Sequence, residues 1–242
     1  NGHPYVKSPI DIACWDIIGK YYKAPIWQLF GGKYGEAIDL YRAISQENPE
    51  TMKERVDQYK SEGYQKFQLK VGGHYQDDIE RIIQVDSILN DSNILVADAN
   101  TGWKTHEALK VIKKTSHLNI YYEQPCSTYN DCLLIRKKNN NPFVLDESIF
   151  SLESFLKAYQ DKAMDIINLK ISKLGGLTKS KQLRDLCVEL KVPMTIEDSW
   201  GGDIATAAIS HLAHSTPIDY RFSSTDFNSY NAISYSEGSP KR

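Results

Sequence analysis

Three short segments decide the fold of this chain of 242 residues: LVADAN (95–100), YYEQP (121–125) and VLDES (144–148). Each is an apolar run that ends on a carboxylate, and a polar or Pro-containing turn follows at once. The carboxylates are Asp98, Glu123 and Asp146, spaced 25 and 23 residues apart. Such spacing predicts the ends of successive strands in a repeated strand–helix unit.

Lys170 in INLKIS (167–172) continues the series 24 residues after Asp146. In barrels of parallel strands, the side chains at the carboxyl ends of the strands share one rim, and that rim carries the chemistry. We therefore expect Asp98, Glu123, Asp146 and Lys170 to converge there.

The same alternation of strand-like and helical runs extends outward from Asp39 to Asp226. It comprises eight strand-like runs with seven helical runs between them, and a leading helix that begins at Ser8 and ends at Gly31-Gly32. Residues 1–7 are expected to lack regular structure. Strands that alternate with helices pair in parallel, and eight of them favour a closed barrel over an open sheet. The predicted fold class is α/β, a (β/α)7β TIM-like barrel, for which about 250 residues are typical.

Composition excludes several classes of function. The chain is 41% hydrophobic and 25% charged with a net charge of −2, which gives no electrostatic basis for binding nucleic acid or a membrane. There is neither a Rossmann glycine motif nor a phosphate-binding P-loop. The four cysteines show no CxxC spacing and no signal peptide is recognisable, so we expect reduced thiols and a cytoplasmic location.

The predicted rim suits one kind of chemistry. Three carboxylates on adjacent strands supply the oxygen ligands that Mg²⁺ prefers. Lys70 ends the second strand and Lys170 the sixth, nearly opposite each other in an eight-stranded ring, so one lysine would face each side of the α-carbon of a bound carboxylate. A lysine with a lowered pKa can remove an α-proton while the metal stabilises the enediolate. This chemistry leads to epimerisation or β-elimination.

Each of these residues also has an ordinary structural interpretation. An Asp after a strand often caps the next helix, Glu123 before Gln-Pro suits a solvated turn, and Lys70 alone resembles an extended surface lysine. None of these interpretations explains the even spacing of the set, so we favour a functional site.

Five motifs in this order resemble the muconate lactonizing enzyme/mandelate racemase-like family of the enolase superfamily. They are Lys70, the DAN of Asp98, the EQP of Glu123, the DES of Asp146, and the DxxNxK that ends in Lys170. The resemblance implies Mg²⁺ ligands at Asp98, Glu123 and Asp146, an acid/base pair of Lys70 and Lys170, and supporting roles for Gln68, Asn100, Glu147 and Asn168. Family members usually carry a lysine where this chain has Gln68.

The resemblance also implies a division of the chain. Residues 1–38 would be a leading helix linking to an N-terminal α+β capping domain that is missing here, residues 39–226 the barrel, and residues 227–242 a truncated C-terminal segment. The expected partners are a small-molecule amino-acid substrate and further copies of the chain in a homo-oligomer.

Three segments are most similar to family members that act on proline derivatives, namely cis-3-hydroxy-L-proline dehydratases and proline-derivative epimerases: FQLKVGG (67–73), EDSWGGDIATAAISHLA (197–213) and STDFNSYN (224–231). The resemblance implies dehydration of cis-3-hydroxy-L-proline to pyrroline-2-carboxylate, with Asp226 pairing with the ring ammonium and Asp198 and Trp200 lining the pocket. Alternatives are a racemase or epimerase of a proline derivative, proline betaine or dipeptide, and a non-catalytic barrel. Thr225 and Asp226, rather than an aromatic cage, favour a substrate with N–H bonds over a betaine.

Overall fold

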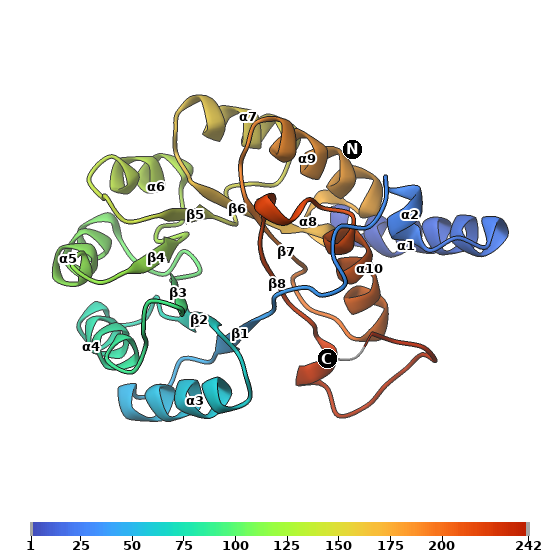
Figure 1. Ribbon diagram of the computed structural model, residues 1–242. Helices are drawn as coiled ribbons and strands as arrows, with labels where there is room; N and C mark the ends of the chain where they lie inside the picture. The colour runs from blue at the N-terminus through green and yellow to red at the C-terminus, as the bar shows by residue number, and fades with distance from the viewer. Residues whose placement is uncertain (1, 241–242) are drawn as a thin grey trace. The chain divides into compact units, whose positions relative to one another are not determined.

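The computed structural model describes residues 2–240, which form two compact units. The first unit comprises Tyr41–Ile149 and Glu153–Ile166, and the second comprises the residues up to Leu40, Phe150–Leu152 and the residues from Ile167 onward. Both consist of parallel strands that alternate with helices, as the sequence predicts (Figure 1).

The first unit holds five strands that pair in parallel in sequence order. They are β1 (Tyr41–Ile44), β2 (Lys66–Lys70), β3 (Ile94–Asp98), β4 (Ile120–Glu123) and β5 (Phe143–Leu145). Its helices are α3 (Pro49–Ser61), α4 (Tyr75–Asp86), α5 (Thr105–Thr115), α6 (Tyr129–Arg136) and α7 (Leu152–Gln160). Figure 1 shows α3, α4, α5 and α6 in succession along the outer side of these strands.

Local sequence explains these elements. In α5, Ala108, Val111, Ile112 and Thr115 recur at helical spacing, and all four are buried. The α3 helix begins with Pro49 at its first position, and the side chain of Asn48 accepts a hydrogen bond from Thr51 N at 3.0 Å. Strands such as β2 are buried on both faces, which is typical of parallel strands covered by helices.

The second unit contains three parallel strands with helices before and between them. The strands are β6 (Ile166–Lys170), β7 (Met194–Glu197) and β8 (Arg221–Ser224). The helices are α1 (Pro4–Tyr22), α2 (Ile26–Leu29), α8 (Ile171–Leu174), α9 (Leu177–Glu189) and α10 (Asp203–His214).

The leading helix begins and ends earlier than the sequence predicts: α1 stops at Tyr22, and α2 (Ile26–Leu29) is a separate helix before Gly31. The expectation that residues 1–7 lack regular structure is wrong for residues 4–7, because α1 starts at Pro4. Its side chains contact the start of α9: Asp11 accepts hydrogen bonds from Thr178 N at 2.9 Å and Thr178 Oγ1 at 2.6 Å, and Trp15 Nε1 donates to Thr178 Oγ1 at 2.9 Å. Proline at the first helical position forfeits no hydrogen bond, so Pro4 is compatible with this start.

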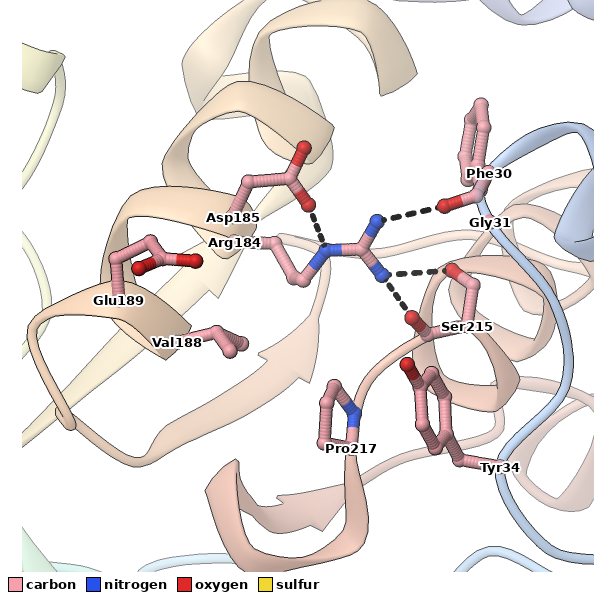
Figure 2. A pocket seen from close by; sticks show the side chains of 9 residues that line it. All are labelled: Phe30, Gly31, Tyr34, Arg184, Asp185, Val188, Glu189, Ser215 and Pro217. Atoms are coloured by element: carbon pink, nitrogen blue, oxygen red, sulfur yellow. Dashed lines mark hydrogen bonds and ion pairs between the residues drawn. The ribbon is translucent and has the colours of Figure 1, made fainter.

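Arg184 joins three helices of the second unit (Figure 2). Its side chain on α9 is 1% exposed. The guanidinium donates to Phe30 O just after α2 at 3.2 Å, to Ser215 O, and to Ser215 Oγ at 2.9 Å just after α10. Asp185 accepts from Arg184 Nε at 2.5 Å. A buried guanidinium is tolerated only when its donors are used in this way.

In the part of the chain that the structure describes, the helices and the cysteines agree with the sequence-based expectations of no membrane span and no disulfide. Among residues 2–240, no helix combines the length and apolar character that a membrane span requires. Cys14, Cys126, Cys132 and Cys187 are all free thiols, as the lack of paired spacing predicts.

Candidate active site

The rim of the first unit brings three of the predicted site residues into one row. Lys70, Asp98 and Glu123 are direct neighbours in the strand register across β2, β3 and β4. Asp98 is 0% and Glu123 2% exposed, and Lys70 Nζ lies 2.5 Å from Asp98 Oδ2. Gln68 Nε2 lies 3.3 Å and 3.1 Å from the two carboxylate oxygens of Glu123. Both buried carboxylates thus meet positively polarised donors, which burial of a charge requires.

Asp146 does not share that register. Glu123 pairs with Val144 of β5, so Asp146 lies two residues farther along its strand direction. Asp146 nevertheless comes directly after the last residue of β5, at a strand end as its spacing predicts, and it is 0% exposed. Gln124 anchors it, because Gln124 Oε1 accepts hydrogen bonds from Asp146 N at 3.1 Å and Ser148 N at 3.2 Å.

Two predicted supporting residues lie beside these carboxylates. Asn100 N donates to Asp98 Oδ1 at 2.9 Å, and Asn100 Nδ2 donates to Glu147 Oε1 at 3.3 Å. Burial raises the pKa of Glu147, and the negative charges of Asp146 and Asp98 raise it further. The rim therefore concentrates negative charge from four carboxylates.

The chemistry of this donor set suits a hard divalent cation. Asp98, Glu123 and Asp146 offer only carboxylate oxygens, which favours Mg²⁺ over the softer zinc. Among the residues that the structure describes, however, no three His, Cys, Asp or Glu side chains come together closely enough to enclose a metal ion. The three carboxylates are the ligand type that this ion prefers, and all three lie at or directly after strand ends. The Lys70 ammonium contacts Asp98, and the Gln68 amide contacts Glu123.

The rim of the second unit holds the other predicted lysine. Lys170 ends β6 and pairs in register with Glu197 of β7, and Lys170 Nζ lies 3.6 Å from Glu197 Oε1. The Glu197 side chain is 2% exposed. Glu197 ends β7, one residue before Asp198, so its strand-end position in the sequence predicts a place on the rim, although no role was predicted for it. Asn168, a predicted supporting residue, is 1% exposed and pairs in register with Thr195.

The three predicted substrate contacts also belong to the second unit. Asp198 Oδ1 accepts hydrogen bonds from Ser172 N at 3.0 Å and Ser199 N at 2.7 Å, so this oxygen orders the turns after β6 and β7. Asp226 Oδ1 accepts from Ser229 Oγ at 2.6 Å. Trp200 is 64% exposed, with its ring centroid 5.4 Å from that of Phe227 and 6.1 Å from that of Tyr230.

Carboxylates and lysines at the ends of parallel strands, in a chain of repeated β/α units, are typical of TIM-barrel enzymes. The sequence profile of the enolase C-terminal domain-like family matches residues 51–239, so the chain belongs to that family. Its membership confirms both the family resemblance and the predicted α/β, TIM-like fold class.

The chain is similar to a dehydratase and to a racemase of amino-acid derivatives. The chain is 56% identical over 241 residues to a cis-3-hydroxy-L-proline dehydratase from Roseibium aggregatum, a match that covers 100% of this chain and 66% of that protein. It is 32% identical to an N-succinyl-L-Arg/Lys racemase from Bacillus cereus, over 90% of this chain and 60% of the racemase.

Solved structures give the same result. A mandelate racemase/muconate lactonizing enzyme from Roseovarius nubinhibens matches with a TM-score of 0.94 and 38% identity, covering 100% of this chain and 67% of the other. An enolase superfamily member from the same organism, complexed with magnesium, matches with a TM-score of 0.91 and 34% identity over 98% of this chain and 65% of the other. The chain thus spans about two thirds of the length of these relatives.

Proposed function

We propose that the protein containing this chain catalyses Mg²⁺-dependent dehydration of cis-3-hydroxy-L-proline to pyrroline-2-carboxylate. One observation carries the proposal: the chain is 56% identical to a dehydratase with that substrate along its whole length, and the paired Lys70 and Asp98 lie within the matched region. Membership of the enolase C-terminal domain-like family supports it.

Lys70 and Lys170 take the acid and base roles in this proposal. One lysine accepts the proton from C2 of the ring. The electron pair left behind expels the hydroxyl from C3, which takes up a proton and leaves as water. The enamine that remains then tautomerises to pyrroline-2-carboxylate, so the substrate is converted to product plus one water.

The carboxylate rim serves the metal. Asp98, Glu123 and Asp146 would hold Mg²⁺, which when bound stabilises negative charge that develops on the substrate carboxylate. Gln68 keeps Glu123 oriented through its amide, and Gln124 keeps Asp146 in place through the main chain. Supporting contacts of this kind fix the orientation of metal-binding side chains.

The substrate contacts remain as the sequence analysis proposes them. Asp226 would receive the ring ammonium, and Asp198 and Trp200 would line the pocket. Asp226 is 9% exposed and Trp200 64%, so the first suits a buried ion pair and the second a surface that the substrate covers.

A racemase or epimerase of a proline derivative, proline betaine or dipeptide is the second candidate. The observation that favours it is the similarity to enzymes named as racemases and epimerases, including the Bacillus cereus racemase and a hydrophobic dipeptide epimerase from Enterococcus faecalis at 27% identity. Such an enzyme would also remove the α-proton, but its substrate has no leaving group, so a proton would be returned to the opposite face of the α-carbon.

We further propose a domain organisation, which the greater length of the relatives supports, and an assembly and a location, which rest on the family resemblance. Residues 1–38 link a capping domain to the barrel of residues 39–226, and residues 227–242 belong to a longer C-terminal segment. The protein forms a homo-oligomer and acts in the cytoplasm.

The test is a product assay on the full-length protein. Pyrroline-2-carboxylate is trapped as a coloured adduct after incubation with each 3-hydroxyproline isomer, with Mg²⁺ or with a chelator. The proposal predicts product only from the cis-3-hydroxy-L isomer, and only in the reactions that contain Mg²⁺ rather than the chelator. Chiral chromatography of the same mixtures detects epimerised substrate. If epimerised substrate forms and no pyrroline product does, the dehydratase proposal is rejected in favour of the epimerase.

A further inference from the structure

A buried carboxylate outside the proposed chemistry lies beside the rim of the first unit. Asp78 stands in the first turn of α4 and is 0% exposed. A buried carboxylate is strongly destabilising unless it is paired and hydrogen-bonded. The donors that surround Asp78 therefore identify the parts of the chain that it holds.

Three of its four donors come from the loops that follow three successive strands, and the fourth, Arg81, lies on α4 itself. Asp78 Oδ2 accepts hydrogen bonds from Gly72 N at 3.0 Å and from Trp103 Nε1 at 2.8 Å. Asp78 Oδ1 accepts from Arg81 NH1 at 2.7 Å and from Gln46 Nε2 at 3.3 Å. Gln46 follows β1, Gly72 follows β2 and Trp103 follows β3. A single side chain thus links three loops at the carboxyl ends of the strands.

The loops after β2 and β3 also touch through their main chains. A Cβ on Gly72 would lie 2.1 Å from Ala99 O, and a Cβ on Gly102 would lie 2.1 Å from Gly72 O. Val71 N donates to Asp98 O at 2.9 Å. Because the two backbones are in direct contact, a shift of one loop displaces the other.

Lys70 and Asp98 are the residues that this arrangement serves. Lys70 lies two positions before Gly72, and Asp98 lies five positions before Trp103. Their contact, 2.5 Å from Lys70 Nζ to Asp98 Oδ2, joins the same two strand ends. Trp103 is 2% exposed, so the hydrogen bond between its indole and Asp78 lies in the packed interior.

We propose that Asp78 is a positioning residue, which holds the loops after β2 and β3 so that Lys70 and Asp98 keep their relative placement. The inference rests on the proposed function, in which Lys70 transfers a proton and Asp98 binds Mg²⁺. Asp78 acts through Gly72 and Trp103 and touches no substrate. Proton transfer depends steeply on alignment, so a small displacement of Lys70 lowers the rate of turnover more than the affinity for substrate.

The test compares three variants of the full-length protein. Asp78→Asn removes the negative charge, and Trp103→Phe removes only the indole donor while an aromatic ring remains. Asp77→Asn is the matched control, because Asp77 lies one residue earlier in the same turn with a side chain that is 59% exposed. The readouts are kcat, KM, Mg²⁺ affinity by calorimetry, and the proton NMR signals of the indole N–H groups.

The chain contains four tryptophans, and the signal that Trp103→Phe removes belongs to Trp103. We expect Asp78→Asn to move that signal upfield, since the carboxylate acceptor has become an amide. In both Asp78→Asn and Trp103→Phe, kcat falls about tenfold, KM stays within about threefold, and Mg²⁺ affinity falls several-fold. Asp77→Asn matches the wild type in every readout.

With a wild type that binds Mg²⁺, two results would overturn the inference. One is an unmoved indole signal in Asp78→Asn, which contradicts the hydrogen bond. The other is a moved signal with unchanged kcat and Mg²⁺ affinity, which reduces Asp78 to a stabilising role. If Asp78→Asn does not fold, Trp103→Phe decides. If the wild type turns over no hydroxyproline but its Mg²⁺ affinity still depends on Asp78, the substrate proposal fails and the positioning role stands. A wild type that binds no Mg²⁺ overturns both.

Discussion

At the scale of single residues, the two candidate catalytic lysines meet different carboxylates. Lys70 Nζ contacts the proposed metal ligand Asp98 at 2.5 Å, whereas Lys170 Nζ lies 3.6 Å from Glu197, which the proposal does not assign to the metal. The side chain of Lys170 is 18% exposed and that of Glu197 is 2% exposed. Removal of Lys170 should therefore separate proton transfer from metal binding.

We predict that Lys170→Ala lowers kcat by at least about a thousandfold, because the general acid/base group is lost. The rise in melting temperature on adding Mg²⁺ should persist, since ligand binding to the folded state stabilises it whether or not turnover follows. Activity assays and thermal melts with and without Mg²⁺ measure both. Lys179→Ala, an exposed lysine on α9, serves as the control. Joint loss of turnover and of the Mg²⁺ effect would contradict the role given to Lys170.

The position of a residue within its strand or helix decides whether the sequence alone marks it as a candidate for the site. The placement of Lys70, Asp98 and Glu123 at one rim was predictable because each ends an apolar strand, and the register sets them side by side. Asp78 was not, because its four donors come from positions up to 32 residues away and no local pattern marks them. Asp98 ends an apolar strand whereas Asp78 lies in the polar first turn of a helix, so only tertiary contacts reveal what Asp78 does.

At the scale of elements, the turn after β2 leaves no room for a side chain on its glycine. Gly72 has a φ of +94°, and a Cβ there would lie 2.1 Å from Ala99 O. Gly31 has a φ of +116° but no atom within 4 Å of its Cβ position. Both positions have a backbone conformation that disfavours a side chain, but only at Gly72 would the added Cβ also collide with the main chain.

We predict that Gly31→Ala lowers the free energy of unfolding by about 1–3 kcal/mol, the usual cost of an unfavourable backbone conformation. Gly72→Ala should lower it by about 2 kcal/mol more, because a backbone carbonyl must move as well. Chemical denaturation of the two variants measures the difference. Equal losses would show that the loops after β2 and β3 separate without penalty.

The elements themselves were largely predictable, since apolar runs of strand length alternate with helical periodicity from β1 to β8. Two features were missed for physical reasons. The start of α1 at Pro4 accompanies side-chain contacts with α9, which local propensity does not contain. The short helix α8 follows β6 directly and ends at Leu174, and the next residue, Gly175, has a φ of +94°, so in the sequence this segment resembles a turn.

At the scale of the whole molecule, two histidines near the end of α10 make stability depend on pH. Burial lowers the pKa of His211, and the charge of His214 lowers it further, while Asp16 opposes the shift. Burial also lowers the pKa of His214, with Lys33 and Arg221 adding to the effect and Glu36 opposing it. Neutral imidazoles are therefore favoured in the folded chain.

The sign follows from linkage. Both folded-state pKa values lie below the unfolded value of about 6.5, so the unfolded chain binds more protons between them. The stability contribution is fully present above about pH 6.5 and is lost as pH falls through the folded-state pKa values. We predict that the double variant His211→Gln/His214→Gln loses less stability than the wild type between pH 7.5 and 5.

Denaturant unfolding across that range provides the measurement. His106→Gln is the control, because His106 lies on the exposed side of α5. A double variant with the same pH slope as the wild type would contradict the assignment of this dependence to α10.

The central claim is that this family member removes an α-proton from a hydroxyproline with the help of Mg²⁺, and proton NMR in D₂O tests it most directly. The full-length protein is incubated with Mg²⁺ and cis-3-hydroxy-L-proline, and the C2 proton is followed in time. We predict that its signal disappears as that of pyrroline-2-carboxylate grows, and that Lys170→Ala leaves it unchanged. A C2 signal that persists with the wild type at the same rate as with Lys170→Ala would contradict the account.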